Sequence, residues 1–414
     1  MCRTKKVEIV AVVAACVLAA GRGGLLAADA APAAGEKPAQ NQTEDWMAAL
    51  RKGWAEKDAY ARDWDRKGPG EQIPVFGKHR QPAIVLSNQG TLLAFAEQYT
   101  GWGDVGEHEI VLKRSVDGGK TWGEQIMVFD DGKANLNGPT PVVDRTTGTV
   151  WVMFARRCKD CLVTHSTDDG LTWTEPKLIE SRKGLWPGQS HGIQLSSGRM
   201  LCPARIGGGG GFWCYYSDDH GANWKKGTWF KSKSLAALLL SPVELMDGTI
   251  YGNMRQMGGR PPIWRRDTWS RDGGLTWDPP KANRALRDAD GPGVKANVIR
   301  LSDERRHDRN RVVFCCPGEG GRKNPLVYIS YDEFKTWSKG KQLLEGVFGY
   351  SDLVALPDHS VGVLFEGGPG KGYVRQAFLR FTMEWLTDGK EKVVPKDKPG
   401  SADVQSVSGA RKDE

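Results

Sequence analysis

The sequence is poor in cysteine and lacks a second cysteine pair. It has 8 cysteines in 414 residues, and Cys158 and Cys161 form a lone C-x-x-C motif. A structural zinc site needs four ligands, which commonly come from two such pairs at a suitable spacing. The motif therefore predicts no zinc site, while a local disulfide, redox chemistry and two plain thiols all remain open. Cys202 and Cys214 stand on predicted strands on either side of the glycine run 207–211, which suggests a cross-hairpin disulfide between them.

A run of basic residues and a long apolar segment are also absent. The formal net charge is +8, but lysine and arginine are spread along the chain, so the sequence predicts no nucleic-acid partner. The apolar stretch at residues 9–20 is too short to span a membrane. With its basic start it predicts a secretory signal over residues 1–30, and a lipoprotein cleavage box at Cys16 is the alternative. We expect a secreted or periplasmic protein with no integral membrane segment in the mature chain.

Glycine and tryptophan, in contrast, are abundant, with 52 and 16 residues. Part of this abundance lies in a repeated motif of the form S-x-D-x-(G)-x-T-W. Its copies begin at Ser115, Ser166, Ser217, Ser270 and Ser330, and their central acids stand at positions 117, 168, 218, 272 and 332. Successive copies thus lie 50 to 60 residues apart, a period typical of solenoids, arrays and propellers.

Each copy of the motif predicts a hairpin turn followed by a strand. Aspartate and glycine favour tight turns, and the tryptophan that follows buries a large apolar surface. Short alternating runs flank the turns, such as residues 109–114 and 149–154, and these are typical of strands. Four short strands in each unit of ~40–50 residues form a propeller blade. Six such units fit residues 71–385, so one blade lacks a recognisable copy of the turn.

The predicted fold class is therefore all-β, a six-bladed β-propeller with a short N-terminal helical segment. We expect a signal peptide over residues 1–30, a linker with the short helix over residues 31–70, the propeller over residues 71–387 and a disordered tail over residues 388–414. The helix is predicted from a capping threonine and an acidic first turn. The tail is predicted from its polar composition, rich in proline, glycine, serine and lysine.

Three arginines from separate predicted blades are candidates for binding an anion. Arg80 precedes a predicted strand, Arg255 ends one, and Arg322 precedes another. Strand edges can border the central funnel of a propeller, and guanidinium binds carboxylate through paired, charge-assisted hydrogen bonds. Asp104 and Tyr350 stand in glycine-bearing segments that could join this group. An acid, a tyrosine and arginines suit hydrolysis of a sugar with a carboxylate at its anomeric carbon, because a neutral phenol approaches that anionic centre without repulsion.

Longer phrases around these candidates form a family pattern. The phrases are HRQP with Arg80, LAFAEQ before Asp104 and IVLKRS after it, NGPTP, HGIQL, NMR with Arg255, GRKN with Arg322, YSDL with Tyr350 and LFE with Glu366. Over about residues 73–385 the chain resembles the exo-α-sialidase (neuraminidase) family of the bacterial secreted, Asp-box (BNR-repeat) kind. The phrases together are specific, whereas the repeated turn also occurs in unrelated propellers.

The resemblance implies a role for each matched residue. The substrate carboxylate would be bound by three arginines, Arg80, Arg255 and Arg322. Glu366 would orient the first arginine, Asp104 would protonate the leaving oxygen and then activate water, and Tyr350 would attack the anomeric carbon. The implied activity is release of terminal sialic acid by a retaining mechanism. Sialylated glycans would be the partners, and no metal or other cofactor is implied.

The family pattern is broken at one position that matters for catalysis. In the family a glutamate lies sixteen residues before the second arginine, and in this sequence that position is Leu239. The glutamate takes the proton from the tyrosine, and general-base help of this kind is worth roughly 10²–10⁴-fold in rate. Lys295 is a smaller departure, since the family often has a polar amide there, near the side groups of the substrate.

Leu239 keeps two other functions open. A non-catalytic or weakly active propeller that binds sialic acid or another acidic glycan would keep the arginines without the base. A hydrolase for a different acidic sugar would keep the chemistry with another specificity. Turnover of a fluorogenic sialoside separates the enzyme from the binder, and a glycan library separates the two kinds of sugar.

Overall fold

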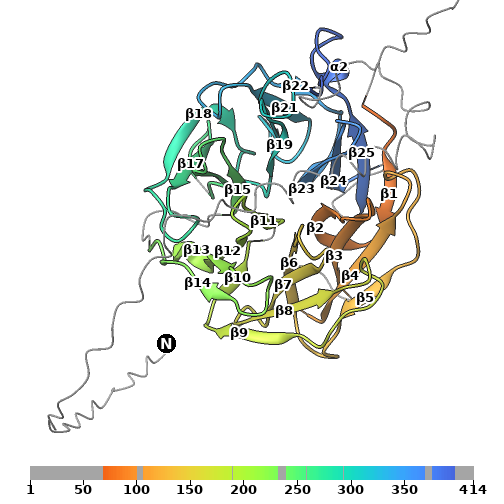
Figure 1. The fold of residues 1–414 in the computed structure, drawn as a ribbon, viewed down its shortest axis with the longest axis vertical. Coiled ribbons are helices and arrows are strands. Elements are labelled where there is room, and N and C mark those ends of the chain that lie inside the picture. The colour runs from red at the N-terminus through yellow and green to blue at the C-terminus, as the bar shows by residue number, and fades with distance from the viewer. Residues whose placement is uncertain are drawn as a thin grey trace, which may run out of the picture. The chain divides into compact units, whose positions relative to one another are not determined.

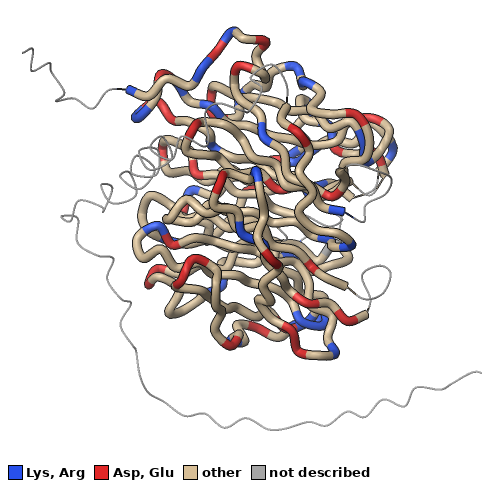
Figure 2. Tube along the Cα trace, turned by 90° about the vertical axis from the view of Figure 1, so that its right-hand side faces the viewer, with Lys and Arg blue, Asp and Glu red and all other residues tan. Residues whose placement is uncertain are grey.

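The computed structural model describes residues 69–99, 106–188, 190–231, 239–257, 259–291, 293–368 and 375–396. The predicted signal peptide, the predicted N-terminal helix and Asp104 lie outside the described residues. No helix in the described part of the chain is long and apolar enough to cross a membrane. Figure 2 shows basic and acidic residues interspersed along the described chain, which agrees with the absence of a basic run in the sequence.

The described residues form six antiparallel sheets arranged around a central axis (Figure 1). Blade 1 comprises β2 (His79–Leu86), β3 (Leu92–Tyr99), β4 (His108–Ser115) and β5 (Ile126–Phe129). Blade 2 comprises β6 (Leu136–Val143), β7 (Val150–Arg156), β8 (Asp160–Ser166) and β9 (Lys177–Ser181). Blade 3 comprises β10 (Leu185–Pro187), β11 (Ile193–Gln194), β12 (Met200–Ile206), the short 3₁₀ helix η1 (Gly207–Gly209), β13 (Gly211–Ser217) and β14 (Lys225–Lys226). Here β10 and β11 both pair with β12.

The remaining three blades follow in chain order. Blade 4 comprises β15 (Leu240–Glu244), β16 (Ile250–Met254), β17 (Trp264–Ser270) and β18 (Lys281–Arg287). Blade 5 comprises β19 (Val298–Ser302), β20 (Arg311–Pro317), β21 (Pro325–Ser330) and β22 (Lys341–Gln342). Blade 6 comprises β23 (Phe348–Ala355), β24 (Val361–Gly367), β25 (Gln376–Phe381) with helix α2 (Met383–Leu386) after it, and β1 (Ile73–Phe76). The first strand thus completes the last blade, and the predicted six-bladed all-β fold is confirmed.

The hydrophobic core lies between neighbouring blades rather than at the axis. Six buried apolar clusters are present among the described residues, and each combines side chains of adjacent blades, two blades in five clusters and blades 4, 5 and 6 in the one that includes Tyr350. Phe95 of blade 1 and Phe154 of blade 2, for example, belong to one cluster. Because each sheet buries both faces in this way, many of its strands are nearly continuous apolar runs. Polar side chains lie along the axis.

The repeated motif forms the same hydrogen-bonded turn in each copy. In the first copy, Ser115 Oγ donates to Asp117 Oδ1 at 2.7 Å and accepts from Gly119 N at 2.8 Å. Thr121 donates to the same aspartate through its backbone N–H at 3.0 Å and its hydroxyl at 2.5 Å. Each turn connects the third strand of its blade to the fourth. The predicted hairpin turn is therefore present at all five copies.

One acid of the motif was misassigned from the sequence. In the third copy the turn is built on Asp219 and not on Asp218, because Ser217 Oγ donates to Asp219 Oδ1 at 2.8 Å. Asn223 donates to Asp219 through its backbone at 2.9 Å and its side chain at 2.7 Å. Asp218 is exposed and pairs with Arg199 instead.

The tryptophans of the first four copies join each blade to the preceding one. Their ring centroids lie 5.5 to 6.0 Å from an aromatic ring of the neighbouring blade, in the pairs Trp122–Phe378, Trp173–Phe95, Trp224–Trp151 and Trp277–Phe212. In the fifth copy Phe334 takes the glycine position with φ 72° and stacks on Tyr251 of blade 4 at 3.7 Å. Blade 6 has α2 where a sixth turn would stand, which accounts for the missing copy.

The cysteines and the C-terminal segment differ from two expectations. Cys202 and Cys214 suggested a cross-hairpin disulfide, but all six described cysteines are free. Cys202 stands opposite Tyr215 and Cys214 opposite Pro203, so the two thiols face opposite sides of the sheet. Beyond α2, contacts with the propeller continue past the boundary predicted at residue 387, because Lys396 N donates to Arg306 O at 2.8 Å. Residues 397–414 of the expected tail lie outside the described residues.

Candidate active site

Arg80 and Glu366 meet where blade 1 adjoins blade 6. Arg80 is near the start of β2 and Glu366 near the end of β24, and Arg80 Nε lies 3.7 Å from Glu366 Oε1. The same carboxylate accepts hydrogen bonds from the backbone N–H of Gln81 at 3.0 Å and of Tyr350 at 3.3 Å. The register of β2 and β3 shifts between Arg80 and Ala83, so a bulge lies directly after the arginine. Glu366 thus holds the backbone beside Arg80 and the backbone of Tyr350 with one side chain.

Opposing effects act on the pKa of Glu366. Its side chain is fully buried, and burial raises the pKa of its carboxyl group. The Arg80 guanidinium and the two backbone N–H groups act in the opposite direction and favour the ionised form. Removing the partner of a buried carboxylate strongly destabilises a protein. The ion pair of Arg80 and Glu366 is therefore a structural part of the site.

Arg255 directly follows β16 and reaches the tyrosine. Its Nη1 donates to Tyr350 Oη at 3.0 Å, and both side chains are buried. Arg255 N donates to Leu239 O at 3.3 Å, so Leu239 lies directly across the strand pair from the arginine. The position where the resemblance expects a glutamate is therefore beside Arg255, and a buried leucine occupies it.

A buried ion pair holds the segment that follows Arg255. Arg265 on β17 is fully buried and its Nη1 lies 3.1 Å from Asp288 Oδ2. Asp288 also accepts hydrogen bonds from Gln256 N at 3.1 Å and Val294 N at 3.0 Å. The pair therefore ties the segment after Arg255 to the loop that leads to β19. Sequence reasoning did not identify either residue, because neither belongs to a motif.

Arg322 lies in the loop between β20 and β21. Its Nη2 donates to Gly293 O at 3.2 Å. Gly293 has φ 66°, and a Cβ there would lie 2.4 Å from Gln256 O and 3.1 Å from Arg255 Cγ. Glycine is therefore required at this position by both backbone conformation and space, and it lets the loop approach the second and third arginines together.

The three predicted arginines converge on Tyr350. The guanidinium carbons of Arg322, Arg255 and Arg80 lie 4.7, 5.5 and 5.8 Å from the centroid of its ring. They come from blades 5, 4 and 1, while the tyrosine comes from blade 6. We call the end of the axis that carries these four residues the arginine end. Such a cluster of guanidinium groups around one phenol suits a carboxylate ligand next to a nucleophile.

Of the remaining predicted site residues, Asp104 lies outside the described residues. Lys295 is 1% exposed and thus does not line the surface where side groups of a substrate would lie. Asp352, two residues after Tyr350, is also buried. It accepts hydrogen bonds from Ile84 N at 3.0 Å and from Leu353 N at 2.9 Å, and its Oδ1 lies 2.7 Å from His191 Nδ1. Buried charges continue from the arginine end along the axis.

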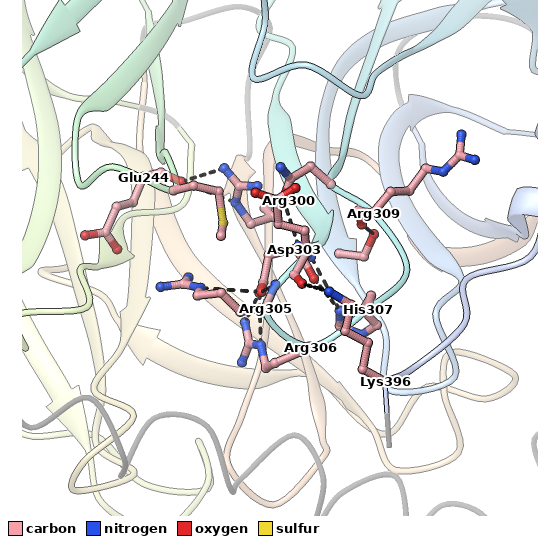
Figure 3. Close-up of polar contacts among 12 residues, drawn as sticks. Glu244, Arg300, Asp303, Arg305, Arg306, His307, Arg309 and Lys396 are labelled. Atoms are coloured by element: carbon pink, nitrogen blue, oxygen red, sulfur yellow. Dashed lines mark hydrogen bonds and ion pairs between the residues drawn. The ribbon is translucent and has the colours of Figure 1, made fainter. Parts of the chain in front are cut away.

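A second group of arginines lies at the opposite end of the axis. There the inner strands β15, β19 and β23 end, and they contribute to a pocket of about 320 Å³ that Arg145, Arg300, Arg305 and Arg306 help to line. Arg300 donates to Glu333 at 2.8 and 2.7 Å. Asp303 lies between Arg305 and Arg306 (Figure 3) and accepts from Arg306 Nε at 2.9 Å. The guanidinium groups of Arg300, Arg305 and Arg306 are thus paired with carboxylates. That of Arg145 donates to Leu86 O at 2.7 Å and to Asn88 Oδ1 at 3.2 Å.

The fold defines the class of protein, a six-bladed Asp-box propeller, and its arginine end gathers three guanidinium groups around one phenol. Residues 56–363 match the BNR repeat-like domain. The chain belongs to the BNR repeat-like family, and the relatives described below are sialidases.

Two bacterial sialidases are among the relatives, each 30% identical to the chain over the aligned residues. One is a sialidase of Micromonospora viridifaciens, aligned over 351 residues that cover 75% of this chain and 52% of the relative. The other is a sialidase of Bacteroides fragilis, aligned over 335 residues that cover 69% of this chain and 59% of the relative. The chain thus spans between half and three fifths of the length of these relatives.

Solved structures agree with the fold. A Hadza microbial sialidase, Hz136, superimposes with a TM-score of 0.63 at 24% sequence identity, covering 75% of this chain and 66% of that one. At this identity the likeness shows the six-bladed fold, and the function has to be argued from the site.

Proposed function

We propose that the chain is a secreted exo-α-sialidase that releases terminal sialic acid from glycans with retention of configuration. The observation that carries this proposal is the convergence of three guanidinium groups on one phenol, with Arg255 donating to Tyr350 Oη at 3.0 Å. The sialidase relatives support it. The substrates would be sialylated glycoproteins, glycolipids or oligosaccharides.

The arginines would bind the carboxylate and place the anomeric carbon at the tyrosine. Paired hydrogen bonds from guanidinium groups fix the orientation of a carboxylate. Glu366 would hold Arg80 in position through their ion pair at 3.7 Å. Bound in this way, the carboxylate would bring the anomeric carbon, to which it is attached, next to the phenol oxygen.

The chemistry would proceed in two displacements. In the first, Tyr350 Oη would form a bond to the anomeric carbon as its phenol proton passes to solvent, the bond to the leaving oxygen would break, and Asp104 would give that oxygen its proton. In the second, Asp104 would take a proton from water, whose oxygen would displace the tyrosine from the sugar, and the released phenolate would regain a proton from solvent. The role of Asp104 rests on the family resemblance. The hydrogen bond from Arg255 would stabilise negative charge on the phenol oxygen whenever it leaves or attacks.

A hydrolysis assay tests the proposal. Purified protein should release the fluorophore from a 4-methylumbelliferyl sialoside, and Tyr350→Phe should reduce kcat by roughly 10³-fold or more, because the phenyl ring has no nucleophilic oxygen. Release by the wild type that is unchanged in Tyr350→Phe would contradict the assigned nucleophile. A panel of other acidic glycosides separates sialic acid from a different acidic sugar.

Leu239 supports a second candidate, a propeller that binds sialic acid without cleaving it. The buried leucine beside Arg255 cannot take a proton from Tyr350. The variant Leu239→Glu distinguishes the two functions. If wild type binds a sialoside without turnover and Leu239→Glu gains turnover, the chain is a binder on a sialidase scaffold. If wild type turns over unaided, the second candidate is wrong.

A further inference from the structure

Lys295 is a buried cation that the proposed mechanism does not use. It precedes β19, its side chain is 1% exposed, and its Nζ donates a hydrogen bond to Pro82 O. Burial lowers the pKa of its ammonium group to about 8, although Asp352, Glu366 and Glu97 act in the opposite direction. A lysine that stays inside a protein at this cost needs a compensating interaction.

The contacts of Lys295 join the strands that carry the arginine end. Pro82 stands two residues after Arg80 on β2. Lys295 O accepts a hydrogen bond from Ser351 N at 3.2 Å, and Ser351 follows Tyr350 on β23. One residue of blade 5 is therefore bonded to blades 1 and 6, beside the residues proposed to bind and attack the substrate.

The three carboxylates near Lys295 each hold a backbone segment of the inner strands. Glu366 accepts from Gln81 N and Tyr350 N, Asp352 from Ile84 N and Leu353 N, and Glu97 from Gly138 N. All three are nearly or fully buried. Basic side chains lie close to all three: Arg80 to Glu366 at 3.7 Å, His191 to Asp352 at 2.7 Å and His108 to Glu97 at 3.7 Å.

We propose that Lys295 is a positioning residue for the carboxylate site: its ammonium group, bonded to Pro82 O, and its backbone carbonyl, bonded to Ser351 N, hold the strands of Arg80 and Tyr350 in register. The inference rests on the proposed function, because it assumes that the arginine end binds an anionic ligand. Lys295 touches no substrate in this account and acts through β2 and β23. The amide that the family often has at this position donates a hydrogen bond but supplies no charge.

The proposal predicts a pH dependence of ligand affinity. Below its pKa of about 8 the lysine is charged, and its hydrogen bond to Pro82 O is charge-assisted. As the pH rises through this value, the ammonium group loses its proton to solvent and this hydrogen bond weakens. We therefore expect the affinity for a sialic acid ligand to fall above about pH 8, with KM rising more than kcat falls, since orientation of the carboxylate is affected first.

The experiment compares wild type, Lys295→Met and Lys295→Gln, with the exposed Lys177→Met on β9 as the control. Affinity for 2-deoxy-2,3-didehydro-sialic acid is measured by calorimetry, and KM and kcat on the fluorogenic sialoside, from about pH 6 to about pH 9.5. Lys295→Met should weaken binding roughly tenfold at neutral pH, since small misplacements of binding groups cost this much or more, and should lack the alkaline fall. Lys295→Gln should regain part of the neutral affinity without regaining the alkaline fall. The control should match wild type.

Four results would decide against the inference. An alkaline fall that persists in Lys295→Met assigns it to another group, and a flat wild-type profile shows that no such dependence exists, even if the variants fail to fold. Full wild-type behaviour in Lys295→Gln reduces the role to a hydrogen bond. If wild type neither binds nor turns over the sialic acid ligands, the proposed function fails and the inference fails with it; binding with a flat profile overturns the inference alone.

Discussion

The two ends of the propeller axis both carry arginines, and they differ in what the arginines contact. At the opposite end, Arg300 and Arg306 are bonded to Glu333 and Asp303 at 2.9 Å or less. At the arginine end, Arg255 donates to the phenol of Tyr350, Arg322 donates to the carbonyl of Gly293, and Arg80 lies 3.7 Å from Glu366. A phenol at the centre of the cluster is therefore the feature that sets the arginine end apart from the carboxylate-paired arginines of the opposite end.

Replacing one arginine at each end is the strongest test of this difference. Arg322→Ala should weaken binding of a sialic acid ligand by roughly 10- to 100-fold, because hydrogen bonds to a charged group are worth about 1.5–3 kcal/mol. The matched variant Arg305→Ala at the opposite end should change affinity by less than about twofold. Isothermal titration calorimetry of both variants measures this directly. Equal losses at the two ends would remove the distinction.

Replacing Gly293 tests whether close packing at the arginine end positions the arginines. Gly293→Ala should reduce ligand affinity roughly tenfold, because its Cβ would lie 2.4 Å from Gln256 O and 3.1 Å from Arg255 Cγ and would displace the arginine. Gly291→Ala is the control, since Gly291 also has a positive φ of 90° but no atom within 4 Å of its Cβ. If both variants bind equally well, the close approach at Gly293 does not position the arginines.

The turn motifs should affect stability without affecting the site. A Cβ at Gly119 would lie 2.1 Å from Phe378 Cε1, so Gly119→Ala should lower the free energy of unfolding by roughly 1–3 kcal/mol through overpacking. Gly132→Ala, with φ 77° and open space, gives the cost of the backbone conformation alone. Urea denaturation of the two variants measures the difference. A loss of ligand affinity in the folded Gly119→Ala protein would show that the turns and the site are coupled.

The fold was predictable because its signal is repeated. Five turns with tryptophan, spaced by the length of a blade, indicate a propeller without any knowledge of the site. The assignment failed where two acids stand side by side: in the other copies the acid follows the serine by two residues, which selects Asp219, and the hydrogen bond from Ser217 confirms it. The register that separates Cys202 from Cys214 is likewise a property of the paired strands.

The site was predictable only in part. The arginines, Tyr350 and Glu366 stand in phrases that resemble a family, so they were identified before their geometry was known. Lys295 was noticed as a departure, but its burial against Pro82 depends on contacts between segments far apart in the chain. The same holds for the ion pair of Arg265 and Asp288, whose residues carry no pattern of their own.

Covalent trapping tests the central claim, that Tyr350 is a nucleophile within the arginine group. The protein is incubated with a 3-fluoro-sialosyl fluoride, whose leaving fluoride needs no acid and whose 3-fluorine slows hydrolysis of the intermediate, and its peptides are analysed by mass spectrometry. We predict one added sialosyl group on the peptide that contains Tyr350, absent in Tyr350→Phe and in the presence of excess competing ligand. Turnover of sialosides with no adduct on Tyr350, or with the adduct on another residue, would contradict the account.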